Sequence, residues 1–161
     1  MWQVNSVYGN ENFYASLEKE LLALIDGEKN LIANLANISA WINHAFPNLN
    51  WCGFYLWNEE DQELVLGPFQ GKPACIRIKP ERGVCGAAFS KGVTMRVDDV
   101  HAFPGHIACD SASLSELVVP LKKDGVVKAV LDLDSPIIKR FDQKDQNEFT
   151  RIMDLLAQKI Y

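Results

Sequence analysis

Two apolar segments near the C-terminus, residues 116–122 and 126–134, are separated by Lys123-Asp124-Gly125. An Asp-Gly pair between two strand-like segments is a strong signal for a β-hairpin. The second segment is apolar enough to predict a central strand, yet it carries Asp132 and Asp134, which the two-residue period of a strand places on one face. Carboxylates on a central strand cost free energy unless they are paired or line a site. The hairpin therefore predicts an antiparallel sheet with a polar site on one face.

The other segments predict helices and further strands around this hairpin. Apolar residues recur at helical spacing in residues 10–25, 28–46 and 142–160, and Asp142 is the expected N-cap of the last helix. The order of elements, without linkers or repeats, predicts a single α+β domain over residues 1–161 in which helices cover the sheet. Shorter elements are expected in five further places: strands at 50–57, at 63–69 with an interruption at Gly67-Pro68, at 75–79 and at 94–97, and a short helix at 83–89.

The charge of the chain argues against several classes of partner. Its 161 residues have a formal net charge of −5, with acids and bases interspersed and no basic stripe, so no nucleic acid and no anionic membrane surface is expected as a partner. The N-terminal residues lack the pattern of a signal peptide, and no apolar run approaches the roughly 18 residues that span a bilayer. These features predict a cytoplasmic protein.

The four cysteines, Cys52, Cys75, Cys85 and Cys109, must be interpreted for that compartment. A reducing cytoplasm disfavours permanent disulfides, so a cysteine there is a buried apolar residue, a metal ligand or a catalyst. None of the four forms a Cys-x-x-Cys pair, which leaves a zinc ribbon or a thioredoxin-type motif without support. For each cysteine taken alone, a buried and inert thiol is the plainest interpretation.

Cys109 lies in residues 100–115, a stretch without helical or strand periodicity that carries two histidines, three serines and an acid. A long loop with reactive side chains is more often functional than a plain connection. We therefore interpret Cys109 as a nucleophile that the other cysteines resolve. A zinc site made of His101, His106, Cys109 and one more thiol is an alternative in ligand type, but the spacing matches no standard zinc pattern. In a third interpretation the histidines only hydrogen-bond the loop.

Three carboxylates form the second part of the candidate site. Glu116 begins the first strand of the hairpin and is expected to approach Asp132 and Asp134. Clustered carboxylates raise one another's pKa, which permits general-acid catalysis near neutral pH, and they also attract a ligand ammonium group. Asp134 has an alternative role as a cap at the end of its strand, before Ser135-Pro136.

Two aromatic residues form the third part. In the strand at 50–57, Trp51 and Tyr55 share one face, and Gly53 between them is expected to leave room for an apolar group the size of a thioether. The alternative is that both rings simply pack beneath a helix. Cys52 lies on the opposite face of this strand and is expected in the core.

Five blocks of sequence point to a known family: Trp51-Cys52-Gly53-Phe54-Tyr55-Leu56, residues 66–75, Gly83-Val84-Cys85-Gly86, residues 103–113 with Ser115-Glu116, and Leu131-Asp132-Leu133-Asp134-Ser135-Pro136. Together they closely resemble the free methionine-(R)-sulfoxide reductases, which consist of a single GAF domain. The blocks are long and in order, and the resemblance extends from about Glu20 to Leu156. It implies a GAF-like central antiparallel sheet flanked by helices.

The resemblance also implies roles for the candidate residues. Cys109 matches the catalytic cysteine, and Cys85 and Cys75 match the two thiols that supply the resolving cysteine, with either one free to attack first. Cys52 lies outside this set. The residues that match the family's substrate pocket are the acids Glu116, Asp132 and Asp134 and the aromatic residues Trp51 and Tyr55.

The expected activity is therefore the reduction of free L-methionine (R)-sulfoxide to methionine. The resemblance implies that Cys109 becomes a sulfenic acid and then part of an intramolecular disulfide, which a thioredoxin-type reductant opens. This chemistry needs no metal and no organic cofactor. The sequence does not decide whether a homodimer forms through the N-terminal helices. The alternatives are a non-catalytic GAF domain that senses a small ligand or redox state, and a peroxide-reducing or disulfide-exchange protein.

Overall fold

Six strands form one antiparallel sheet in the computed structural model, which describes residues 5–106 and 110–161. In chain order they are β1 (Trp51–Asn58), β2 (Glu63–Gly71), β3 (Arg77–Ile78), β4 (Met95–Val97), β5 (Ser115–Lys123) and β6 (Val126–Ser135). The order across the sheet is β3-β2-β1-β6-β5-β4. The central pair, β1 and β6, therefore joins segments that lie far apart in the sequence.

The predicted hairpin is confirmed as β5 and β6. These strands pair antiparallel around Asp124 and Gly125, both of which have positive φ angles, 51° and 81°. Two consecutive residues with positive φ give the type I′ geometry that matches the twist of a two-strand ribbon. The apolar residues of β6 lie at the centre of the sheet, between β1 and β5, as their composition predicts.

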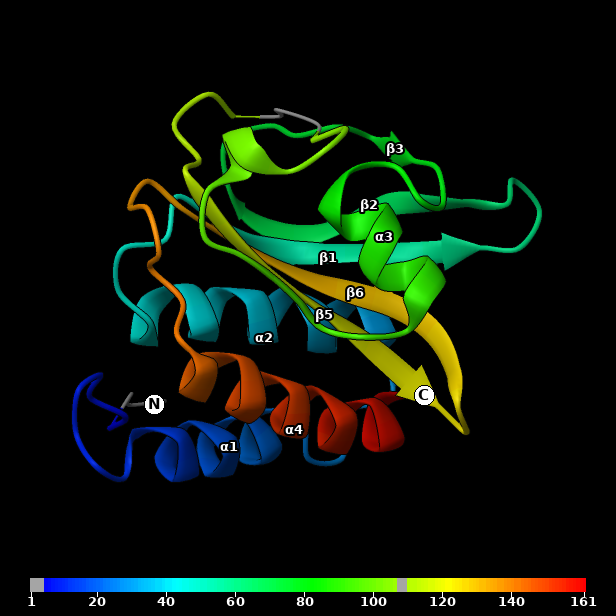
Figure 1. Cartoon of the computed structure of the whole chain (residues 1–161). Helices are drawn as coiled ribbons and strands as arrows, with labels where there is room; N and C mark the ends of the chain where they lie inside the picture. Colours follow the sequence, from blue (N-terminus) through cyan, green and yellow to red (C-terminus); the bar gives the residue numbers. More distant parts are fainter. Residues whose placement is uncertain (1–4, 107–109) are drawn as a thin grey trace.

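Three helices lie on one side of the sheet: α2 (Leu31–Ala45) and α4 (Gln143–Ile160) pack against the strands, and α1 (Phe13–Leu24) packs on these two helices (Figure 1). Their apolar stripes meet side chains such as Leu131 and Leu133, which are fully buried. Burying a leucine side chain contributes roughly 1.5–3 kcal/mol, so this layer holds much of the folding free energy. Asp142 is the N-cap of α4 as predicted, and it forms a reciprocal capping box with Asp145.

The opposite face is covered by α3 (Gly83–Lys91), with the one-turn 3-10 helix η1 (Val100–Ala102) beside it (Figure 1). Val84 and Ala88 of α3 pack with Val118 and Val130 of the sheet. This layer is smaller, because a single short helix replaces three longer ones. The antiparallel sheet and the helices on its two faces give the α+β architecture predicted from the sequence.

Strand β2 departs from the prediction, because Gly67-Pro68 does not interrupt it. Gly53 of β1 pairs with Phe69 and Tyr55 pairs with Leu66, so β2 holds one extra residue opposite Phe54. A bulge of this kind tolerates a proline without a ladder donor. The expected strand at 75–79 is also shorter, with only two residues paired in β3. Among the described helices, none is both long enough and apolar enough to cross a bilayer.

Candidate active site

The register of the three central strands aligns the candidate acids on the face beneath α3. Trp51 of β1 pairs with Asp134 of β6, and Asp134 pairs in turn with Glu116 of β5. In the next row of the same face, Asp132 lies between Gly53 and Val118. Cross-strand neighbours of this kind are about 4.5–5.5 Å apart. The sheet alone therefore brings all three predicted carboxylates together.

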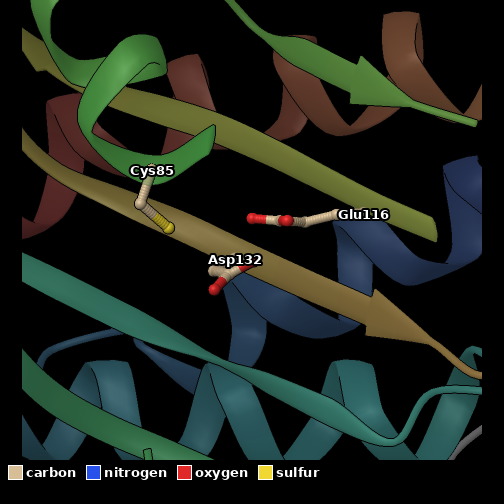
Figure 2. Close-up of side chains that lie close together, drawn as sticks. All are labelled: Cys85, Glu116 and Asp132. Atoms are coloured by element: carbon tan, nitrogen blue, oxygen red, sulfur yellow. The ribbon is translucent and has the colours of Figure 1, made fainter. Parts of the chain in front are cut away.

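A thiol from α3 completes the group. The Sγ atom of Cys85 and one carboxylate oxygen each from Glu116 and Asp132 lie within 4.8 Å of one another. Figure 2 shows the three side chains converging from α3, β5 and β6. All three are more than nine-tenths buried, with 4%, 5% and 7% of their surface exposed. These residues, together with Asp134, are called the acid–thiol cluster below.

Burial controls the protonation of this cluster. Desolvation raises the pKa of Glu116 and of Asp132 well above the ordinary carboxyl range, and the neighbouring acids raise them further. The pKa of Asp134 rises for the same two reasons, burial first and the charge of Asp132 second. Cys85 lies in the first turn of α3, where the helix dipole favours a thiolate. Burial, and after it the neighbouring Asp132, nevertheless raise the pKa of Cys85 well above its usual value, which favours the neutral thiol.

His106 borders the cluster on the loop side. Its Nε2 atom lies 3.5 Å from a carboxylate oxygen of Glu116. Burial lowers the pKa of His106 and raises that of Glu116, so near neutral pH both groups favour their uncharged forms.

Aromatic residues form one wall of the pocket above the cluster. The rings of Trp51 and Tyr55 stack with their centroids 5.8 Å apart, and Trp51 also stacks on Phe69 at 5.2 Å. Both predicted aromatic residues line the pocket. Gly53 serves a different purpose from the one expected. A Cβ atom at Gly53 would lie 2.3 Å from the Cβ atom of Phe69, so the glycine makes room for Phe69 and Trp51 rather than for a ligand.

Polar contacts fix the described end of the loop over the pocket. The Asn50 amide donates to Asp110 at 3.3 Å and to the Ser113 hydroxyl at 2.9 Å. Lys72 forms a 3.3 Å ion pair with the other oxygen of Asp110. That carboxylate also accepts the backbone N–H of Ala112, and this hydrogen bond is the main reason why the pKa of Asp110 is lowered. These contacts hold residues 110–113 against the β1–β2 end of the sheet.

The remaining predicted residues lie in different settings. Cys109 lies outside the described residues. Cys75 is half-buried just before β3, is disulfide-bonded, and its carbonyl oxygen accepts a 3.0 Å hydrogen bond from the Tyr55 hydroxyl. Cys52 is fully buried in the core on the other face, as expected. His101 is exposed and is absent from the pocket lining, so of the two predicted histidines only His106 borders the pocket.

Sequence reasoning missed the anchoring residues Asn50 and Lys72. Each lies 38 residues or more from the loop residues that it contacts, and neither belongs to a local motif. The only signal was indirect, because Lys72 falls within one of the sequence blocks that resemble a known family. A contact between a strand end and a distant loop depends on the tertiary fold.

Comparison with known proteins places this geometry in a family. The GAF domain family model matches residues 24–160. Protein YtsP of Bacillus subtilis is 50% identical over 157 residues, which cover 97% of this chain and 96% of that protein. The free methionine-R-sulfoxide reductase of Escherichia coli is 48% identical over 141 residues, covering 88% of this chain and 84% of that enzyme.

A solved structure agrees with the sequence comparison. The free methionine-R-sulfoxide reductase of Neisseria meningitidis, solved in complex with its substrate, superposes with a TM-score of 0.92 at 41% identity. The match covers 99% of this chain and 95% of that one. The chain has a GAF domain and belongs to the family of the free methionine-R-sulfoxide reductases.

Proposed function

We propose that this protein reduces free methionine (R)-sulfoxide to methionine, with Cys109 as the nucleophile. The observation that carries the proposal is the acid–thiol cluster, whose carboxyl groups are buried, close together and biased toward their protonated forms at the base of an aromatic pocket. Buried acids of this kind destabilise a fold and so point to a chemical role. Membership in the family supports the same substrate.

In the first step, the Cys109 thiolate attacks the sulfoxide sulfur. The S–O bond of the sulfoxide breaks, the oxygen ends on Cys109 as a sulfenic acid, and methionine leaves. The substrate sulfur gains two electrons and the cysteine sulfur loses two. Glu116 or Asp132 donates a proton to the sulfoxide oxygen, because the raised pKa of each group keeps a carboxyl proton available near neutral pH.

The pocket selects a free amino acid by binding its charged ends. Asp134 lies in the same cross-strand row as Trp51 and is the least buried of the three acids, so it is placed to accept the substrate ammonium group. Trp51 and Tyr55 supply an apolar wall for the methylthio group. A methionine within a polypeptide has no free ammonium group for the acid, which favours the free amino acid over a protein-bound residue.

We propose Cys75 as the first resolving thiol. It is half-buried and disulfide-bonded, whereas Cys85 is a free thiol buried among carboxyl groups that disfavour its ionisation. The Cys75 sulfur attacks the sulfenic acid of Cys109, water leaves, and a disulfide forms. The dithiol of a thioredoxin-type reductant then opens this disulfide by exchange, which returns both cysteines to thiols.

The test couples turnover to NADPH oxidation through thioredoxin and its reductase, with the R and S epimers of free methionine sulfoxide compared. We expect turnover of the R epimer alone, its loss in Cys109→Ser, and its retention in Cys52→Ala, which removes a thiol from the opposite face of the sheet. A folded, reduced protein that turns over neither epimer would favour a ligand-binding GAF sensor. Turnover of peroxide in place of the sulfoxide would identify a peroxide reductase.

A further inference from the structure

The acid–thiol cluster combines donor atoms that suit a metal ion as well as a substrate. The Sγ atom of Cys85 and carboxylate oxygens of Glu116 and Asp132 come from three separate elements and point toward one common position (Figure 2). All three atoms lie within 4.8 Å of one another. Donor atoms around a tetrahedral zinc ion are about 3.5 Å apart, so side-chain shifts of about 1 Å would bring them to coordinating distance.

A second observation points to a ligand at this position. The Oδ1 atom of Asp132 is buried and has no hydrogen-bond partner among the described residues. A buried carboxyl oxygen without a partner is costly, and a ligand that bound this oxygen would remove the cost. Asp132 is itself one of the residues that line the pocket.

We propose that Cys85, Glu116 and Asp132 form a binding site for a divalent cation of the zinc type, with His106 as a fourth ligand. The mixture of sulfur, oxygen and imidazole nitrogen selects this class, because Zn²⁺ accepts four such ligands. Ca²⁺ and Mg²⁺ require more ligands, and those ligands are oxygen atoms. His106 is the candidate for the fourth ligand because its Nε2 atom lies 3.5 Å from a Glu116 oxygen.

The cation acts as an inhibitor in this arrangement rather than as a cofactor. It occupies the acids that the proposed function assigns to the sulfoxide oxygen, so cation and substrate exclude each other. Only this competition rests on the proposed function, and the binding site itself does not. A binding experiment without turnover therefore tests the site independently.

The experiment uses the full-length chain with Cys75→Ser and Cys109→Ser, which leaves Cys85 and Cys52 as the only thiols. Any affinity tag is removed first, and Co²⁺ is then titrated into this double variant. The readout is the near-ultraviolet thiolate-to-cobalt charge-transfer band. We expect one Co²⁺ per chain, displaced by Zn²⁺. Adding Cys85→Ser should abolish the band, and adding Cys52→Ala should leave it unchanged.

Two further variants test the oxygen and nitrogen ligands on the same background. Asp132→Asn should weaken Co²⁺ binding by at least about 10-fold, as losing even an outer partner of a metal site does, and His106→Ala should weaken it by a similar or smaller factor. Thermal unfolding and circular dichroism establish that each variant is folded. The absence of stoichiometric binding to the folded double variant, or an undiminished band after Cys85→Ser, would refute the site.

Discussion

The two faces of the sheet use the same strands for opposite purposes. On the face beneath α1, α2 and α4, Cys52, Leu117 and Leu133 form one cross-strand row of fully buried side chains. The adjacent row, which faces the other side of the sheet, contains Asp134 and Glu116 where this row has leucines. Since side chains alternate along a strand, adjacent residues of β6 belong either to the core or to the pocket.

Cys52 and Cys85 illustrate the same contrast in one residue type. Both are free, buried thiols, and burial raises the pKa of both. Cys52 has apolar neighbours, so packing in the core explains its burial. Cys85 instead lies against carboxyl groups on the pocket side. A buried cysteine is thus no evidence for or against a site until its neighbours are known.

The largest expected effect is on the pocket face. Glu116→Gln should lower the rate of sulfoxide reduction by roughly 100- to 10,000-fold, because it removes a general acid and keeps the shape of the side chain. At neutral pH the variant should be at least as stable as the parent, since it also removes an ionisable group that burial disfavours. The measurements are the coupled NADPH assay and urea unfolding. Glu59→Gln, at an exposed turn, is the matched control, and equal activity of the two variants would contradict the assignment.

The core face should respond in the opposite way. Leu133→Ala changes the residue between Asp132 and Asp134 and should lower the free energy of unfolding by about 2–5 kcal/mol, because it leaves a cavity in the packed layer. Activity per folded molecule should be retained well below the new unfolding midpoint. Urea unfolding of Leu133→Ala, compared with urea unfolding of Asp132→Asn, checks this contrast between the core face and the pocket face. If Leu133→Ala removed activity while leaving stability unchanged, the separation of the two faces would be wrong.

Stability should depend on pH through the pocket acids. Glu116, Asp132 and Asp134 have raised pKa values in the folded state, so above the ordinary carboxyl pKa of about 4 the native state binds more protons than the unfolded chain. Their contribution is therefore fully present below that pH and is lost as the pH rises through the raised values. Urea unfolding across this range should show a shallower decline for Asp132→Asn than for the parent. Parallel curves would show that Asp132 ionises as freely in the fold as in water.

Part of this division was predictable from the sequence. The alternation in residues 129–134 and the Asp-Gly turn predict the hairpin, and the same alternation places Asp132 and Asp134 on one face. The pairing of β1 with β6 was not readable, because these strands are separated by more than half of the chain's elements and no local pattern specifies which strands become neighbours. Glu116 is predicted to join the other acids because it begins the neighbouring strand of the hairpin, and its pairing with Asp134 confirms this.

The role of Gly53 shows where sequence reasoning stops. Its position between two aromatic residues suggested space for a ligand, but whether such a space is open depends on a partner strand. Phe69 fills it, and Phe69 reaches Gly53 only because the bulge at Gly67-Pro68 shifts the register of β2. The position of His106 beside Glu116 depends in the same way on the path of the loop.

The smallest expected effect lies at the boundary between the pocket wall and the cysteine-bearing segment. The Tyr55 hydroxyl donates to the carbonyl oxygen of Cys75 at 3.0 Å, and Tyr55→Phe removes that bond while keeping the ring that stacks on Trp51. We expect a loss of about 0.5–1.5 kcal/mol in the free energy of unfolding. We also expect slower recycling by thioredoxin, because the segment that carries Cys75 loses an anchor. Single-turnover measurements separate this step from sulfoxide reduction, and a selective loss in the reduction step would instead assign the hydroxyl to the substrate.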